Sequence, residues 1–368
     1  MLSKLLKKTQ KPQLGLDISY QGITGVLLGK ENKKLFLKVC SYEPFEEEVI
    51  QNGLIINPAA FNKTLMNLIN KNKIDVKTVN IAVPSNVAFI KNITLPDLAL
   101  EELKVIANQE ASKHIPFGIN DVNIDFEILE STRKQETSGK KIDVVLVALA
   151  KTIAKSNIDM LYDIGFSISA IDVAPFAMIR TLANAGLIDE SDSLCISVLV
   201  GYENTDINVI YKGKPLFSHN TPIGKKNIID SLENNLGIDN QSVENLLPQV
   251  ALIVPGINIS LDPQLSKAAT IARTIYNNIS GEIQKTIEFY NSQNTEIKEI
   301  ERVIIGGAGI CIQNIDKYIA SRLKIDTLLC NSLNNIENNI DYSENSIYPI
   351  NIPALATSVG LALRGLQN

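Results

Sequence analysis

Three short segments of the chain carry residues that could hold a phosphate group and a metal ion. Each follows an apolar run, and the residues are Asp17, then Gly201 with Thr205, then Gly306-Gly307-Ala308-Gly309. Backbone N–H groups at such turns bind phosphate oxygens, glycine allows close approach because it has no Cβ, and aspartate can hold Mg²⁺. Singly, each residue is more often an ordinary turn or packing residue. In this order and spacing, they indicate a fold that closes over a nucleotide.

The first two segments belong to two similar strand–turn–strand units that lie about 180 residues apart. One unit covers residues 14–28 and the other covers residues 195–210, so each opens one half of the chain. The apolar run 303–305 then leads into the glycine turn. Strands and helices alternate elsewhere, which is typical of α/β domains with mixed sheets. The sequence therefore predicts a duplicated α/β domain.

Composition narrows the function further. The chain has 368 residues, 45% hydrophobic and 20% charged, which is ordinary for a globular protein of two or more domains. The net charge of −5 is spread without a basic block, which argues against a nucleic-acid-binding protein. No apolar run approaches the roughly 18–20 residues of a membrane span. The lysine-rich residues 1–11 could contact an anionic bilayer, but a solvated tail is the simpler interpretation.

The number and spacing of cysteines and histidines argue against disulfide, zinc-binding and histidine-based catalytic sites. The 4 cysteines are widely spaced and form no Cys-x-x-Cys pair, so a disulfide framework or a zinc site is not expected and a reducing cytoplasm fits best. With only 2 histidines, a histidine-based catalytic centre is not expected either. We predict no catalytic residue.

Apolar spacing predicts the elements between these motifs. Helices are expected at 59–72, 97–114 with Asp97 as N-cap, 152–164, 174–185, from 225, at 263–291 and, amphipathic, at 354–366. Further strands are expected at 79–83, 86–95, 123–129, 143–150, 168–173 and 300–305. Polar stretches predict a hairpin loop at 131–141 and a surface loop at 331–346. Residues of about 85–155 thus form a β-α-β-β insertion in the first half.

Several motifs, taken in order, resemble those of one known family. They are Leu14-Gly15-Leu16-Asp17-Ile18, Ala82-Val83-Pro84, Leu95-Pro96, Glu110 to Ile115-Pro116-Phe117, Asp172-Val173-Ala174-Pro175-Phe176-Ala177, Gly306-Gly307-Ala308-Gly309 and Val359-Gly360-Leu361-Ala362-Leu363-Arg364. The chain resembles the PilM family, actin-like cytoplasmic proteins of type IV pilus assembly that are related to the division protein FtsA. The match covers nearly the whole chain, and the segment ending in Ile-Pro-Phe is the most distinctive.

The resemblance implies an actin-like ATPase (ribonuclease H-like) fold with duplicated α/β domains and an FtsA-type inserted subdomain. The expected divisions are a basic tail 1–13, a first domain 14–89 with 152–192, an inserted subdomain 90–151, a second domain 193–224 with 300–368, and its subdomain 225–299.

The resemblance also implies a partner and a location. Family members bind the cytoplasmic N-terminal tail of the membrane protein PilN in a groove that involves the inserted subdomain. Ile115, Pro116 and Phe117 could line that groove, or Phe117 could fill a core behind a helix stop. A cytoplasmic position beneath the inner membrane, other platform proteins and a homo-oligomer or ring are further expectations.

Departures from the family pattern gather at the nucleotide site. Four positions differ from the residues that family members usually have: Ser19 replaces a glycine, Thr24 a lysine, Leu199 an aspartate and Ala174 a glutamate. An acidic–basic pair that the family has near the adenine, around Glu244, is not evident either. A charge-assisted contact is worth about 1.5–3 kcal/mol, so two or three losses weaken binding by several decades. We therefore expect no cofactor, or ATP with Mg²⁺ held weakly and with Asp17 as the metal ligand. The residues expected to keep any contact are Asp17, Ser19, Tyr20, Gly201, Thr205, Gly224, Lys225, Gly306, Gly307, Ala308 and Gly309.

Three functions remain open at this point. The leading hypothesis is a structural adaptor that captures a peptide tail. The alternatives are an ATP-dependent protein, either a filament-forming ATPase or a sugar-kinase relative, and an FtsA-like division protein; fold alone cannot separate them. The chain stops at Asn368 without the linker and terminal helix that anchor FtsA, which disfavours the division hypothesis.

Overall fold

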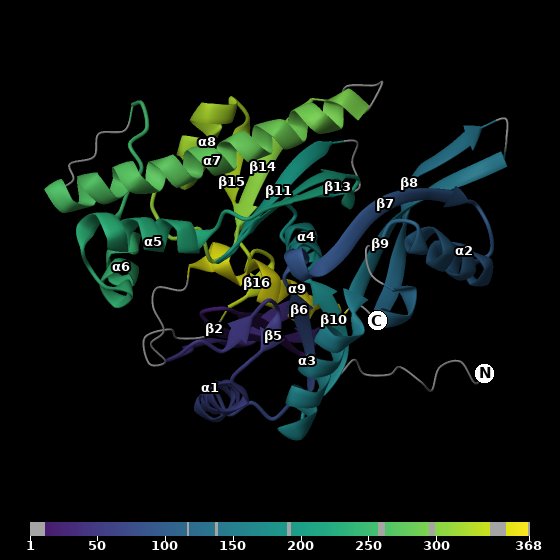
Figure 1. The fold of residues 1–368 in the computed structure, drawn as a ribbon, viewed down its shortest axis with the longest axis horizontal. Coiled ribbons are helices and arrows are strands. Elements are labelled where there is room, and N and C mark those ends of the chain that lie inside the picture. Colours follow the sequence, from purple (N-terminus) through teal and green to yellow (C-terminus); the bar gives the residue numbers. More distant parts are fainter. Residues whose placement is uncertain are drawn as a thin grey trace.

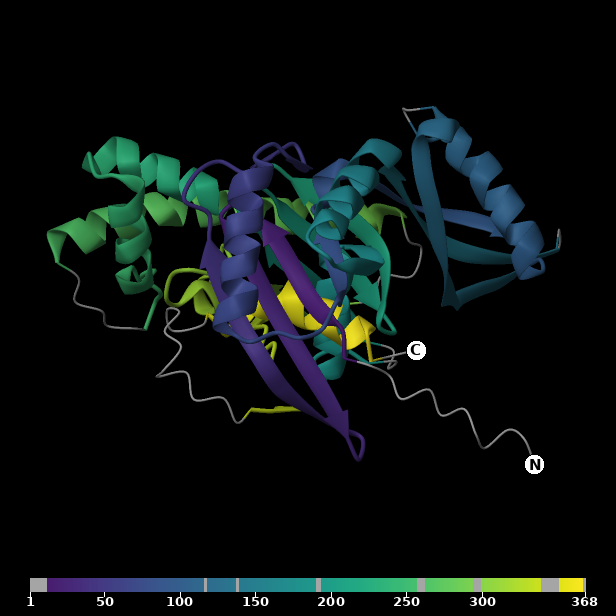
Figure 2. The same cartoon turned by 90° about the horizontal axis from the view of Figure 1, so that it is seen from below.

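A computed structural model describes residues 12–115, 118–136, 139–189, 193–256, 262–293, 299–338 and 351–366. Two large sheets face each other across a layer of helices, and a smaller sheet extends from one end (Figures 1 and 2). Most of the expected tail 1–13 lies outside the described residues, as do Pro116 and Phe117. None of the helices in these ranges combines the length and the hydropathy that a membrane crossing needs.

The first sheet has six strands in the order β10-β6-β1-β2-β3-β16. Their bounds are β1 Leu14–Ser19, β2 Gly22–Glu31, β3 Lys34–Pro44, β6 Thr78–Val83, β10 Ser167–Val173 and β16 Ile336–Glu337. β1 and β2 form the first hairpin, in which Asp17 lies opposite Thr24. A short hairpin, β4 (Ile50–Gln51) and β5 (Leu54–Ile55), follows β3. The apolar faces of α1 (Pro58–Lys71) and α3 (Lys151–Asp163) cover one side of the sheet.

The other side of the first sheet is covered by α9 (Ala356–Arg364), which α4 (Ala174–Asn184) packs against in turn. A Cβ at Gly360 would lie 1.9 Å from the carbonyl oxygen of Ala177, so only glycine lets the two helices come this close. The expectation of an amphipathic final helix is therefore wrong: α9 is buried on all sides because it lies between the sheet and α4.

Asp172, at the end of β10, connects these elements. Its carboxylate oxygen Oδ2 forms ion pairs with Arg180 of α4 and with Arg364 of α9, each at 3.0 Å. Two of the sequence motifs that suggested the family, around Asp172 and around Arg364, therefore meet in one ion-pair cluster at the buried Asp172 carboxylate. Their role in this fold is to join α4 and α9 to the sheet.

The inserted sheet has three strands in the order β7-β9-β8, with α2 on one face. The bounds are β7 Ala88–Pro96, α2 Leu100–Ser112, β8 Val122–Glu136 and β9 Gly139–Ala150. Asp97 is not the N-cap of α2: the cap is Ala99, which has no capping side chain, and Glu101 and Glu102 favour the helix start through its dipole instead. The loop expected at 131–141 is also wrong, because backbone pairing continues to Glu136 opposite Gly139 whatever the polarity of the side chains.

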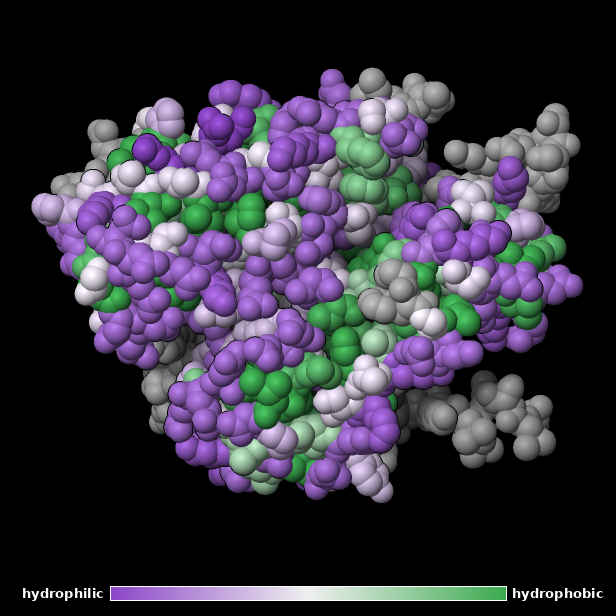
Figure 3. Space-filling view, in the orientation of Figure 1, coloured by the Kyte–Doolittle hydropathy of each residue, from purple (hydrophilic) through white to green (hydrophobic). Residues whose placement is uncertain are grey.

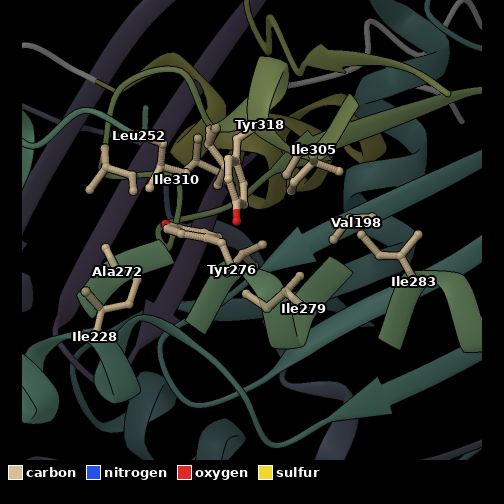
Figure 4. Packing of buried hydrophobic residues seen from close by; sticks show 14 of the residues in the cluster. Val198, Ile228, Leu252, Ala272, Tyr276, Ile279, Ile283, Ile305, Ile310 and Tyr318 are labelled. Carbon is tan, nitrogen blue, oxygen red and sulfur yellow. The ribbon is translucent and has the colours of Figure 1, made fainter. Parts of the chain in front are cut away.

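The second sheet has five strands in the order β13-β12-β11-β14-β15. Their bounds are β11 Leu194–Val200, β12 Thr205–Tyr211, β13 Lys214–Thr221, β14 Ile300–Gly306 and β15 Asp326–Leu329. Helices α5 (Lys225–Leu236), α6 (Asn240–Leu246), α7 (Pro263–Gln293) and α8 (Ile315–Leu323) pack on one face. The helix expected at 263–291 is confirmed as α7. It turns an apolar stripe to the core, where Tyr276 is the largest fully buried side chain of the described residues (Figure 4).

Short connections complete the described chain. Single 3₁₀ turns lie at Ser85–Val87, Ile119–Asp121, Leu247–Gln249 and Ile352–Leu355. The prediction of a surface loop at 331–346 is wrong in its first part, because β16 pairs with β3 and Ile336 is buried beside Leu37. Residues 339–346 lie outside the described chain.

The inserted sheet also touches the second sheet. The side-chain amide of Asn92 on β7 donates to the carbonyl oxygen of Leu216 at 2.6 Å and to that of Pro215 at 3.1 Å, both on β13. Lys214 of β13 pairs with Glu127 of β8. The inserted sheet is therefore joined to the first half by the chain and to the second half by side chains.

Candidate functional site

The two expected phosphate turns face each other. The turn between β1 and β2 brings Tyr20 against Tyr202, which follows β11, with ring centroids 6.2 Å apart. Gln21 of the same turn reaches Lys225 at the start of α5 and Glu244 on α6. We call this set of five residues the hairpin junction.

Within the part of the chain that the structure describes, three polar side chains of the hairpin junction bond only to one another. The amide nitrogen of Gln21 donates to Glu244 Oε1 at 2.6 Å. The ammonium of Lys225 donates to Glu244 Oε2 at 2.7 Å and to the amide oxygen of Gln21 at 3.3 Å. The side chains of Lys225 and Glu244 are only 11% and 23% exposed, so this ion pair is screened less than a surface pair. Glu244 thus has Lys225 as its basic partner, which the sequence did not make evident.

Asp17 lies at the end of β1, close to this junction. Burial raises the pKa of its carboxyl to about 6, and among the described residues it has no hydrogen-bond or ion-pair partner. The neighbouring turn uses its own donors: the Ser19 hydroxyl donates to the Gly22 carbonyl at 2.9 Å and accepts from the Gln21 N–H at 3.3 Å. Burial, with the nearby Glu203 carboxylate, raises the pKa of Tyr20 to about 12.

The turn after β11 also bonds within itself. The N–H of Gly201 donates to the Asn204 carbonyl at 2.8 Å, and the N–H of Lys225 donates to the Gly201 carbonyl at 3.0 Å. The hydroxyl of Thr205 donates to the Ile223 carbonyl at 2.6 Å. Groups that could cradle a phosphate therefore hold the turn against the start of α5.

The expected glycines have packing roles. A Cβ at Gly224 would lie 2.4 Å from the Tyr202 carbonyl oxygen, and one at Gly307 would lie 2.3 Å from that of Val200. Gly307 also has φ +103°, which side chains rarely adopt. The N–H of Gly309 donates to the same Val200 oxygen at 2.8 Å. Close contact with the end of β11 is sufficient reason for this turn to be glycine-rich.

Leu199 and Gly306 lie in an apolar environment, unlike the polar residues of the hairpin junction. Leu199 is 6% exposed and packs with the buried side chains of Met178 and Cys330, and a Cβ at Gly306 would meet the same two residues. Ala308, between these glycines, is exposed at the tip of the turn. The family's second acidic position is thus part of an apolar core between β11 and α4.

Several groups that the family resemblance assigns to a Mg²⁺–nucleotide site have other partners in the described structure. Within the described ranges, no group of three or more His, Cys, Asp or Glu residues could hold a metal ion. Asp17 faces no second acid at position 199, and Lys225 is paired with Glu244 and Gln21. The backbone N–H groups of Gln21 and Gly201 are bonded within their own turns. Sequence reasoning placed the two turns but missed Gln21 and Tyr202, for which the only signal is their position at the two tips.

The segment that was expected to line a peptide groove belongs to the inserted subdomain, not to the hairpin junction. Ile115 is 7% exposed and packs inside the inserted subdomain with Leu103 and Val144, so it is a core residue in this structure. Pro116 and Phe117 lie outside the described residues.

An apolar surface does occur between the first sheet and the inserted sheet. Val87, Ala88, Ile153 and Ile171 are only partly buried there, and they pack over the buried side chains of Val83, Leu149 and Ala154. Figure 3 shows hydrophobic residues gathered where α3 and β10 approach the inserted sheet. We call these residues the subdomain junction.

Comparison with known proteins agrees with this architecture. A solved PilM–PilN type IV pilus biogenesis complex is 20% identical, with a TM-score of 0.81 over 98% of this chain and 100% of that chain. The ethanolamine utilization protein EutJ from Carboxydothermus hydrogenoformans is 13% identical, with a TM-score of 0.55 over 96% of this chain and 89% of that one. MreB5 of Spiroplasma citri bound to AMPPNP is 12% identical, with a TM-score of 0.52 over 96% and 95%. These likenesses show the actin-like ATPase fold.

The family model for the type IV pilus assembly protein PilM matches residues 15–366. This span includes both hairpins, the inserted sheet and the buried final helix. The chain therefore belongs to the PilM family of type IV pilus assembly proteins.

Proposed function

We propose that this protein is a scaffold of the type IV pilus assembly platform that captures the cytoplasmic N-terminal tail of a PilN-like membrane protein. The observation that carries the proposal is the whole-length likeness to a protein solved in a PilM–PilN complex, with a TM-score of 0.81. The proposed location is the cytoplasmic face of the inner membrane. Other platform proteins and further copies of this chain, in a ring, would be its neighbours there.

The subdomain junction is the proposed docking surface for that tail. Its partly buried valine, alanine and isoleucine side chains present apolar area that a short peptide can cover. The surface lies between two sheets, where an extended peptide can place alternate side chains against it.

The scaffold is proposed to work without ATP hydrolysis. In support, the lysine of the hairpin junction is already paired, and Asp17 is a lone aspartate beside the junction. A kinase or ATPase would also need a positioned base for the attacking hydroxyl or water. Asp17 is the candidate, but it would face the metal ion instead.

Calorimetric titration tests the proposal. A synthetic peptide with the sequence of the host's PilN-type N-terminal tail is added to the purified full chain, with and without Mg-ATP. Saturable one-to-one binding that is the same in both conditions is expected. Binding that requires Mg-ATP would instead make the protein a nucleotide-gated switch, and no binding in either condition would overturn the proposal.

A pair of variants on α3 locates the surface. Ile153→Lys places an ammonium group among the apolar side chains of the subdomain junction, and we expect at least about a tenfold loss of peptide affinity, or 1.4 kcal/mol. Ile158→Lys is the matched control, because Ile158 is on the same helix but 45% exposed and outside that set. Equal affinities for the two variants would place the peptide elsewhere.

A further inference from the structure

The two halves of the molecule meet through side chains at the hairpin junction. Gln21 belongs to the β1–β2 turn of the first half, whereas Lys225 and Glu244 belong to α5 and α6 of the second. Each of the three bonds to the other two, at 2.6, 2.7 and 3.3 Å. Separating the turns therefore breaks two hydrogen bonds to charged groups at once and leaves Gln21 without these partners.

An aromatic contact lies beside this polar triangle. The rings of Tyr20 and Tyr202 pack at a centroid distance of 6.2 Å with a tilt of 30°. These residues lie at the tips of two turns in which the N–H groups of the neighbouring Gln21 and Gly201 are bonded internally. The space between the turns is thus bridged by the protein's own side chains, at the two turns where the family resemblance predicts a nucleotide.

We propose that Gln21, Lys225 and Glu244, together with the Tyr20–Tyr202 contact, form a clasp that keeps the two halves closed without a nucleotide. The clasp takes over the bridging role of the ligand and fixes one relative position of the two hairpins. It is independent of which peptide the protein binds, because none of its residues lies in the subdomain junction.

The 4 cysteines provide a built-in test of the clasp. Cys311 is partly buried and follows the glycine turn. Burial raises the pKa of its thiol to about 11, and the charges of Lys225 and Glu244 also act on this pKa. Cys40 is partly buried too, but it is on β3, away from the clasp. Cys195 and Cys330 are buried in the core between β11 and α4, so they are expected to react only when the protein unfolds.

The experiment measures the iodoacetamide alkylation rate of each cysteine by mass spectrometry in the full-length protein and in Gln21→Ala. Loss of the clasp is expected to accelerate Cys311 about tenfold, which corresponds to 1.4 kcal/mol, while the other three rates stay unchanged. The matched control is Gln284→Ala, which breaks an exposed Gln284–Glu288 bond within α7 and is expected to change no rate.

Two results would overturn the clasp. An unchanged Cys311 rate in Gln21→Ala would mean that the halves stay closed without it. Acceleration of all four cysteines together would mean that Gln21 stabilises the whole fold and not this contact. Neither result bears on peptide capture, which the calorimetric titration measures separately.

Discussion

The hairpin junction and the subdomain junction are both places where two parts of the chain meet. They differ in whether their side chains are already bonded to one another or still present accessible surface. At the hairpin junction, Gln21, Lys225 and Glu244 satisfy one another. At the subdomain junction, partly buried side chains such as Ile153 and Ile171 present apolar area over a buried layer. The surface that we propose as the peptide-docking site is therefore apolar and lies beside the inserted sheet.

The largest expected effect comes from restoring the missing acid. Leu199→Asp puts a carboxylate among apolar side chains, including Met178, and is expected to lower the free energy of unfolding by about 3–5 kcal/mol, measured by urea denaturation. It is expected to give no Mg-ATP binding in calorimetry. Leu199→Met, which keeps the volume, is the control and should cost less than about 1.5 kcal/mol. A stable Leu199→Asp protein that binds Mg-ATP would show that one substitution separates this junction from a nucleotide site.

A smaller, pH-dependent effect is expected at Asp17. Its pKa is raised from 3.8 to about 6 in the folded protein, so the folded state is penalised as pH rises between these values and fully above pH 6. Asp17→Asn removes the penalty and should add up to about 3 kcal/mol to the free energy of unfolding near pH 7.5, but only a few tenths near pH 4. The measurement is urea denaturation at both pH values. A gain that is equal at both would rule out titration of this carboxyl as its cause.

The smallest effect concerns the ring contact of the hairpin junction. Tyr202→Ala is expected to cost about 1–2 kcal/mol of unfolding free energy, since an aromatic pair adds about 0.5–1.5 kcal/mol beyond the area that it buries. Tyr162→Ala is the matched control, because Tyr162 is 75% exposed, and should change stability by less than about 0.5 kcal/mol. If both variants cost the same, the contact between the two tips contributes nothing to stability.

Much of the fold could be predicted because the signals are local. The strands of both hairpins, the glycine turn after β14 and the stripe along α7 depend on apolar spacing and on glycine within a few residues. Local signals failed where distant parts of the chain decide the outcome. The polarity pattern of residues 354–366 does not reveal that α9 lies between a sheet and α4, and polar residues conceal the outer pairing of β8 with β9.

The candidate site was predictable in place but not in detail. Asp17 and Gly201 were expected near one another from the motif order, and Lys225 from the family resemblance. The structure brings their segments together at the hairpin junction. The bond from Gln21 to Glu244 joins residues 223 positions apart, and one sequence holds no information on such a distance. The departures from the family pattern indicated a weakened site, but they could not indicate which side chains now bridge it.

The contact of Asn92 with β13 has a consequence for solubility. β7 and β13 are each the outermost strand of their own sheet, and such strands carry unpaired backbone groups that can recruit strands from other molecules. By binding the carbonyl oxygens of Pro215 and Leu216, Asn92 holds the two edge strands against each other. Pro215 also has no backbone N–H that could pair with a strand of another molecule. The inserted sheet thereby covers an edge of the second sheet that could otherwise pair with a strand of another molecule.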